Sequence, residues 1–295
     1  MGSADASVTL AGMVVAPDTR ALKLSRRDVL LVPLAVSPVA CRGGEAPSSG
    51  STRSPQRPSS PSGSASCDSG RAAESIAPLD AITLGPRDEP GGILVVLLHG
   101  WGARGDDLVP LARALAHPDA RFVVAAAPLE RENGGRAWWH LDRGDRPAQA
   151  WGDELPIDHR PHPAVVAARA AVQRLLRTAI ERHAPEHTVL VGFSQGAMLA
   201  LDVALQGSPA VDRVAVLSGA LLADSLIALR SAERPHPTVL VAHGRKDAIV
   251  PFRAGESTTR VLSARGVDVT WFPFEGGHAI PPRVVGRLKR FVVEG

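Results

Sequence analysis

Residues 192–196 contain the residue types and spacing that most clearly indicate chemistry. They read Gly-Phe-Ser-Gln-Gly and fit the pattern G-x-S-x-G. Apolar residues 188–191 before the pattern predict a buried strand, and residues 197–205 after it predict a helix. In that context the pattern is typical of a nucleophile elbow, a tight turn that lifts a serine hydroxyl above a sheet. We therefore predict that Ser194 is a nucleophile; the alternative is an ordinary strand-to-helix turn.

A serine hydroxyl is a poor nucleophile unless a base takes its proton and a carboxylate orients that base. After a strand–turn–helix elbow, the expected chain order is Ser, then Asp or Glu, then His. Asp247 follows a strand predicted at 238–242, and His278 follows one predicted at 269–274, so both placement and order fit. Asp224, which follows a strand predicted at 212–218, is the alternative acid. Four other histidines lie at element ends, where a solvated or locally bonded ring is ordinary: His183, His187, His236 and His243.

A tetrahedral intermediate of acyl transfer needs two backbone N–H donors for its oxyanion. The residue after the nucleophile, Gln195, should supply one of them. The other should come from the loop after the strand at residues 93–98, which reads His99-Gly-Trp101-Gly. We predict that Trp101 N–H is this donor, and that the His99 side chain braces the loop rather than taking part in the reaction.

The segments that must position these residues alternate between strand and helix patterns. Continuous apolar runs that end in Gly or Pro are typical of strands buried on both faces of a parallel sheet. The predicted strands are 76–84, 93–100, 121–128, 188–193, 212–218, 238–242 and 269–274, and the predicted helices are 106–116, 164–183, 197–205, 253–265 and 281–293. We therefore expect an α/β fold with a mostly parallel central sheet and helices on both faces, whose site lies at the carboxyl ends of the strands.

The N-terminal segment, residues 1–41, has the features of an export signal. Residues 25–31 resemble a twin-arginine motif, and the apolar run at 29–40 has the length of a signal-peptide core. It ends in Ser-Pro-Val-Ala-Cys41, which resembles a lipoprotein box, although Pro38 stands where an aliphatic residue is usual. We expect an exported bacterial protein that is either lipidated at Cys41 and membrane-anchored, or cleaved after Ala40 and periplasmic or secreted. Met13 is an alternative start.

Composition divides the remainder of the chain in two. Residues 42–75 are dominated by Ser, Pro, Gly, Arg and Ala and should form a disordered tether, so residues 76–295 form the catalytic domain. The two cysteines, Cys41 and Cys67, lie outside that domain. They lack metal-ligand spacing, although a disulfide between them is possible if Cys41 is not lipidated. The net charge of +3, without a basic run, does not indicate nucleic-acid binding, and no segment has the roughly 18 apolar residues of a membrane span.

Four stretches together resemble the phospholipase/carboxylesterase family of α/β-hydrolases, which includes acyl-protein thioesterases. They are Leu-His-Gly-Trp-Gly at 98–102, Gly-Phe-Ser-Gln-Gly at 192–196, His-Gly-Arg-Lys-Asp at 243–247 with Val-Pro at 250–251, and Gly-His at 277–278. The resemblance covers roughly residues 77–295. It implies that Trp138 and Trp139, in a loop where the family has a W-F-type pair, lie near an acyl pocket. Family members are mostly cytosolic, and the leader lies outside the resemblance.

Together these features predict a serine carboxylesterase that needs neither metal nor cofactor and cleaves small-molecule esters of small or medium acyl chains. An acyl thioesterase or lysophospholipase, or a peptidase or depolymerase, would use the same residues on the same fold. A binding lipoprotein that has lost catalysis is the alternative from another class. The tryptophan-rich stretch at 129–163 could wall or cover the substrate, or could be a surface excursion pinned on the sheet.

Overall fold

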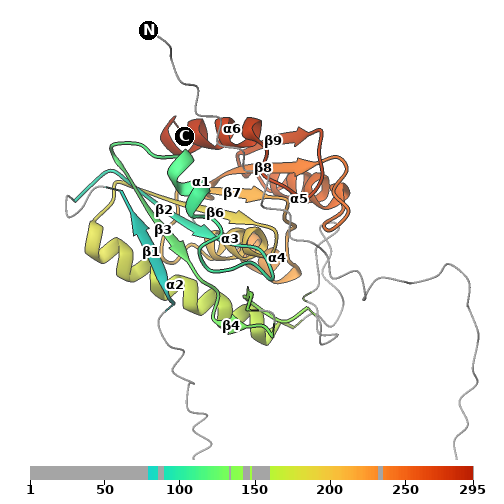
Figure 1. The fold of residues 1–295 in the computed structure, drawn as a ribbon. Coiled ribbons are helices and arrows are strands. Elements are labelled where there is room, and N and C mark those ends of the chain that lie inside the picture. The colour runs from blue at the N-terminus through green and yellow to red at the C-terminus, as the bar shows by residue number, and fades with distance from the viewer. Residues whose placement is uncertain are drawn as a thin grey trace, which may run out of the picture. The chain divides into compact units, whose positions relative to one another are not determined.

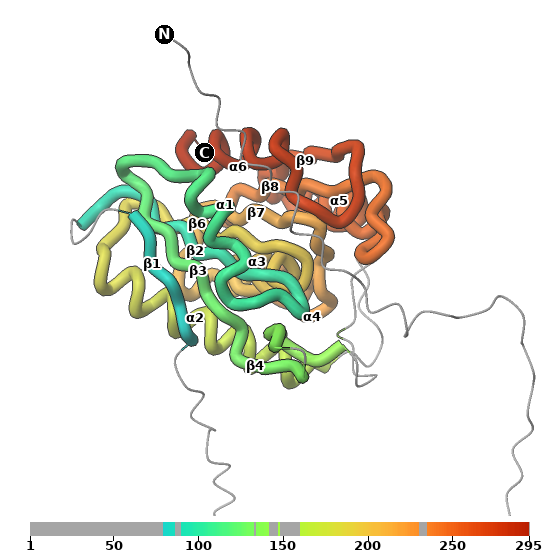
Figure 2. Tube along the Cα trace, viewed as in Figure 1, coloured from blue at the N-terminus to red at the C-terminus, as the bar shows by residue number. Residues whose placement is uncertain are grey.

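The computed structural model describes residues 79–85, 90–132, 134–141, 147, 160–231 and 235–294. The predicted leader, the lipidation site Cys41, Cys67 and the predicted tether lie outside these residues, so they stay predictions. Figure 1 shows the fold of the described part of the chain as a ribbon, and Figure 2 traces the same view as a tube.

A seven-stranded sheet forms the centre of the fold (Figure 1). Its order is β1-β3-β2-β6-β7-β8-β9, with β1 antiparallel to β3 and every other neighbouring pair parallel. The strands are β1 (Ala81–Leu84), β2 (Ile93–Leu98), β3 (Ala120–Ala125), β6 (His187–Phe193), β7 (Arg213–Leu217), β8 (Thr238–Gly244) and β9 (Val269–Phe274). All six residues of β2 are buried, as expected of a strand covered on both faces.

Helices cover both faces of this sheet. One face packs against α1 (Val109–Ala114) and α6 (Pro282–Glu294), and the other against α2 (Pro163–His183), α3 (Gln195–Gln206), α4 (Ala223–Ser231) and α5 (Phe252–Ala264). In Figure 2, β1 marks one edge of the sheet, and β9 with α6 marks the opposite edge. The expected α/β architecture is therefore confirmed: it is the α/β-hydrolase fold.

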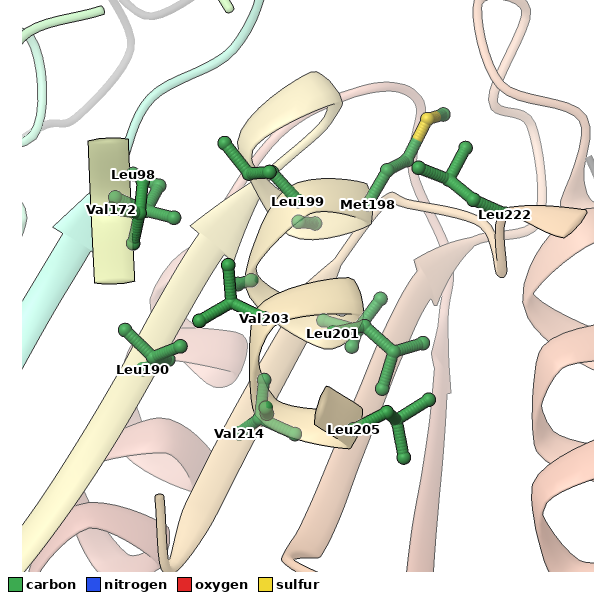
Figure 3. Packing of buried hydrophobic residues seen from close by; sticks show 14 of the residues in the cluster. Leu98, Val172, Leu190, Met198, Leu199, Leu201, Val203, Leu205, Val214 and Leu222 are labelled. Carbon is green, nitrogen blue, oxygen red and sulfur yellow. The ribbon is translucent and has the colours of Figure 1, made fainter. Parts of the chain in front are cut away.

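Helix α3 is buried over almost its whole length, and apart from Gln195 and Asp202 its buried residues are apolar or Gly on all sides rather than along one stripe. Figure 3 shows its side chains packed between the sheet, which contributes Leu190 and Val214, and Val172 of α2. This packing fixes the helix whose first turn follows Ser194. The nucleophile candidate therefore directly precedes a helix that is buried in the core.

Two features of the fold were not predicted from the sequence. Helix α4 occupies residues for which we expected no element, and a short hairpin forms from β4 (Leu129–Glu130) and β5 (Arg136–Ala137). The predicted boundaries otherwise match to within a few residues; β1 is shorter than the predicted 76–84, and its first predicted residues lie outside the described part. None of the helices that the structure describes has the length and apolar character needed to cross a membrane.

Candidate active site at the carboxyl ends of the strands

Ser194 lies in the turn between β6 and α3 with a backbone conformation that side chains rarely adopt, at φ 55° and ψ −118°. Such a conformation costs about 1–3 kcal/mol and persists only where surrounding structure enforces it. Here the Ser194 N–H donates to the Leu217 carbonyl at 2.9 Å. A Cβ at Gly192 would overlap the first turn of α3, and one at Gly196 would overlap the Leu98 carbonyl. Both glycines are therefore required by close backbone approach.

The predicted acid and base are brought together by neighbouring strands β8 and β9. His278 Nδ1 lies 2.8 Å from Asp247 Oδ2. The loops that carry them continue the strand pairing, because Lys246 N–H donates to the Gly276 carbonyl at 2.9 Å. The His278 ring also packs on Phe193, with ring centroids 4.8 Å apart. Because Phe193 directly precedes Ser194, this contact places the imidazole beside the nucleophile elbow.

The Asp247 carboxylate is buried and hydrogen-bonded through both oxygens. Oδ1 accepts from the N–H groups of Ile249 and Val250, both at 2.9 Å, and Oδ2 faces His278 and, at 3.4 Å, His243 Nε2. Burial alone would raise the pKa of Asp247, but the bonds to His243, His278 and Val250 outweigh it and hold this pKa well below its usual range. Asp247 is therefore a carboxylate that can orient an imidazole and stabilise its charged form.

The alternative acid, Asp224, lies elsewhere. It is in the first turn of α4, where its Oδ2 accepts the N–H of His162 at 3.0 Å and lies 3.7 Å from Arg169 Nη2. Arg169 also bonds Asp202, a buried residue of α3, at 2.6 Å. The structure thus groups Asp224 with the charged cluster that joins α2, α3 and α4, whereas His278 pairs with Asp247.

The loop after β2, which carries the predicted second oxyanion donor, lies against the elbow. A Cβ at Gly100 would come within 3.2 Å of Ser194 Cβ. His99 is fully buried; its Nε2 accepts the N–H of Ala127 at 3.0 Å, so Nδ1 carries the proton and donates to the Gly100 carbonyl at 2.8 Å. Because C=O and N–H of a trans peptide point in opposite directions, this bond turns Trp101 N–H away from the His99 ring.

This assignment fits the electrostatics of the His99 ring. Burial lowers the pKa of His99 and outweighs the opposing effect of the Gly100 hydrogen bond. A neutral ring is the form that can accept one hydrogen bond and donate another, which is the bracing role expected for His99.

The Gln195 side chain makes a contact that sequence reasoning missed. Its Oε1 accepts the N–H of Trp138 at 2.9 Å, and its Nε2 donates to the Trp139 carbonyl at 2.8 Å. The amide thereby forms a two-point clamp between α3 and the segment after β5. Gln195 is the first residue of α3, so its own N–H has no acceptor within the helix and stays available to an anion.

Trp138 and Trp139, predicted to lie near an acyl pocket, are each 1% exposed and belong to the main hydrophobic core. The Trp138 indole N–H donates to the His99 carbonyl at 2.9 Å, and its ring lies 5.5 Å from that of His99. Trp138 therefore supports the loop beside Ser194, whereas the Trp139 carbonyl is bonded to the Gln195 side chain. Their contact with a substrate stays a prediction.

The Trp101 indole is half-buried, and the Arg131 guanidinium lies 3.7 Å above its ring. The backbone of the same loop is tied to the segment at β5, because Gly102 N–H donates to the Arg136 carbonyl and Arg136 N–H to the Ala103 carbonyl, both at 2.8 Å. The predicted oxyanion loop is thus held on both sides. Within the described residues, no group of three or more His, Cys, Asp or Glu side chains is arranged to hold a metal ion.

Comparison with known proteins identifies the family and fold to which this chain is similar. The model of the Phospholipase/Carboxylesterase family matches residues 84–294. Acyl-protein thioesterase 1 of Gibberella zeae is 32% identical over 113 residues, a stretch that covers 37% of this chain and only 48% of the relative. A protein of Oryza sativa subsp. japonica, named as a probable inactive carboxylesterase, is 25% identical over 69% of this chain and 84% of its own length. The crystal structure of esterase PE8 superposes with a TM-score of 0.60 at 26% identity, covering 73% of this chain and 98% of that one.

Proposed function

Because the chain belongs to the phospholipase/carboxylesterase family of α/β-hydrolases, we propose that it is an active serine carboxylesterase with Ser194, Asp247 and His278 as its triad. The observation that carries the proposal is the placement of His278, bonded to Asp247 at 2.8 Å and packed on the residue that precedes Ser194. The proposal is supported by the chain order Ser194, Asp247, His278 and by the position of all three after strands of the central sheet.

In the proposed reaction the Ser194 hydroxyl attacks an ester carbonyl while His278 takes its proton. The Asp247 carboxylate stabilises the imidazolium that forms. The N–H groups of Gln195 and Trp101 hold the oxyanion of the tetrahedral intermediate. His278 then protonates the leaving alcohol, and an acyl-enzyme remains on Ser194. A water molecule, deprotonated by His278, attacks the acyl-enzyme and releases the acid.

Two alternative functions remain, one with a different substrate and one without catalysis. The resemblance to an acyl-protein thioesterase favours a thioester as the second candidate, since the same residues would cleave it. The resemblance to a relative named as probably inactive makes a non-catalytic binding protein the rival from another class. Against that rival stands the strained Ser194 backbone, because strain of this kind is typical of functional sites.

The test is hydrolysis of p-nitrophenyl esters, from acetate to palmitate, and of a matched acyl thioester, with fluorophosphonate labelling as an independent readout. Ser194→Ala should lower kcat by about 10⁶-fold and abolish labelling while the protein stays folded. The matched control is Ser218→Ala. Like Ser194, Ser218 has a positive φ, 50°, at a strand end, but it is only 1% exposed and so is not accessible to the probe. Labelling that persists in Ser194→Ala, or is lost in Ser218→Ala alone, would refute the assignment.

A further inference from the structure

A second buried histidine, His243, contacts the carboxylate of the proposed triad. It lies near the end of β8, is fully buried, and directs Nε2 at two acceptors. The Val250 carbonyl is 2.9 Å from this nitrogen and Asp247 Oδ2 is 3.4 Å from it. Two oxygen acceptors on one ring nitrogen require that nitrogen to carry the proton. The sequence alone suggested an ordinary histidine at an element end; the ring is bonded locally, but it is not solvated.

The surroundings of His243 fix its ring in this orientation. Its other nitrogen, Nδ1, is buried and has no hydrogen-bond partner within the described residues. Gly255 of α5 backs it so closely that a Cβ there would lie 2.7 Å from Nδ1. The Phe252 ring stands edge-on to the imidazole, with centroids 6.1 Å apart. A flipped ring would turn a carbon toward the Val250 carbonyl and Asp247, so the polar contacts select this orientation while the packing holds the plane of the ring.

From this geometry we propose that His243 is a positioning residue for the reaction: its Nε2–H, shared between Val250 and Asp247, holds the Asp247 carboxylate toward His278 and moderates its basicity. The inference rests on the proposed triad. Oδ2 of Asp247 is the oxygen that both histidines face, whereas Oδ1 is held by two backbone N–H groups. A second donor on Oδ2 competes with His278 for the same lone pairs and thereby weakens the pull of the carboxylate on the His278 proton.

The groups around His243 and Asp247 decide whether removal of His243 disturbs other charges. Asp247 is the titratable side chain in contact with His243; α5 contributes Phe252 and Gly255 to the ring's surroundings, and neither titrates. Two cations, Arg245 and Lys246, lie on the loop between His243 and Asp247. The Arg245 guanidinium lies 5.1 Å from the Phe252 ring and pairs with Glu275 at 3.4 Å. Removal of His243 therefore changes the hydrogen bonding of Asp247 without removing a neighbouring ion pair.

The experiment compares the pH dependence of kcat/KM for the full chain, His243→Leu and His243→Gln, with rates normalised to fluorophosphonate-titrated active sites. His243→Leu removes the donor. We expect the plateau kcat to fall about tenfold with KM little changed, because the Asp247 carboxylate is no longer held in the orientation that positions His278. The acid limb of the pH profile should move to higher pH, because a carboxylate that has lost one hydrogen-bond donor attracts a neighbouring positive charge more strongly. His243→Gln, whose amide nitrogen reaches a similar position, should restore both towards wild type.

The matched control is His183→Leu, which removes another buried histidine, at the end of α2 beside Gly91 and the start of β2. It should leave the acid limb unmoved. The proposal is overturned if His243→Leu lowers the rate per active site without moving the limb, or if His243→Gln behaves like His243→Leu.

Two further readouts do not depend on turnover. Nitrogen NMR of the wild-type protein should find the His243 proton on Nε2; a proton on Nδ1 instead would refute the inference. The far-downfield proton resonance of the His278–Asp247 bond should shift in His243→Leu and return in His243→Gln. A wild type inactive on every ester would refute the proposed function alone, because these signals report on the Asp247 contacts directly.

Discussion

The Gln195 clamp leads to a prediction that separates the side chain of this residue from its backbone. Gln195→Met keeps the volume and the backbone N–H but removes both amide hydrogen bonds. The N–H of Trp138 and the carbonyl of Trp139 then remain buried without the partners they have at 2.9 and 2.8 Å. We expect a less stable protein that still acylates at Ser194, because the proposed oxyanion donor is retained.

The magnitude follows from the two orphaned backbone groups. Each buried polar group left unsatisfied costs about 1–3 kcal/mol. The apolar methionine side chain is itself well suited to the buried site, where Gln195 is 2% exposed, so it offsets part of this loss. We expect the free energy of unfolding to fall by about 2–5 kcal/mol. For a domain of this size each kcal/mol lowers Tm by about 2–4 °C.

The assay is urea unfolding of wild type and variant, with kcat/KM measured well below the transition. The matched control is Gln173→Met on α2, because the Gln173 amide makes a single exposed bond to the Ser208 carbonyl, at 2.9 Å. That control should change stability by less than about 0.5 kcal/mol. Equal stability of the two variants would refute the clamp. A Gln195→Met protein as stable as wild type but inactive would mean that the side chain acts in the reaction and not in the support.

Two further perturbations test the close approaches around the elbow. Gly196→Ala should destabilise the protein by about 3 kcal/mol or more, because its Cβ would overlap the Leu98 carbonyl. Gly286→Ala on α6, where nothing lies within 4 Å, should be neutral or stabilising by up to about 1 kcal/mol. Thermal unfolding compares the two variants, and equal Tm values would contradict the packing argument. Below about pH 6.5 the unfolded chain binds a proton at His99 that the folded chain excludes. As the pH is lowered, the free energy of unfolding should therefore fall more steeply in wild type than in His99→Gln, by up to about 1.4 kcal/mol per pH unit. Parallel curves from urea unfolding between pH 7 and 5 would refute the buried neutral ring.

The parts of the fold that the sequence predicted depend on local pattern. Parallel strands buried on both faces are continuous apolar runs, and β2 and β6 have this pattern. The elbow is recognisable because it needs two glycines at fixed spacing. Helix α4 escaped prediction because Ala223–Ser231 is buried on several sides and shows little helical periodicity. The hairpin of β4 and β5 has two residues a strand, too few for any periodic signal.

The contacts that the sequence could not predict join residues far apart in the chain. Nothing near Gln195 indicates that its amide will meet a backbone 57 residues earlier. His243 was grouped with ordinary element-end histidines because its burial depends on Gly255 and Phe252 of a later helix. The contact between Asp247 and His278 could be predicted because both follow neighbouring strands. The supporting contacts depend on side-chain packing that strand order does not fix.

The two supporting histidines share one arrangement. Each precedes a glycine at the carboxyl end of a parallel strand, His99-Gly100 after β2 and His243-Gly244 in β8, and each is fully buried with one ring nitrogen on a nearby backbone carbonyl. In both cases a Cβ on the glycine would crowd the neighbouring part of the site: Ser194 beside Gly100, and the segment that leads to His278 beside Gly244. The imidazole orients the loop, and the missing side chain lets the loop approach. One dipeptide thereby brings the proposed oxyanion donor to the nucleophile, and the other brings the acid to the base.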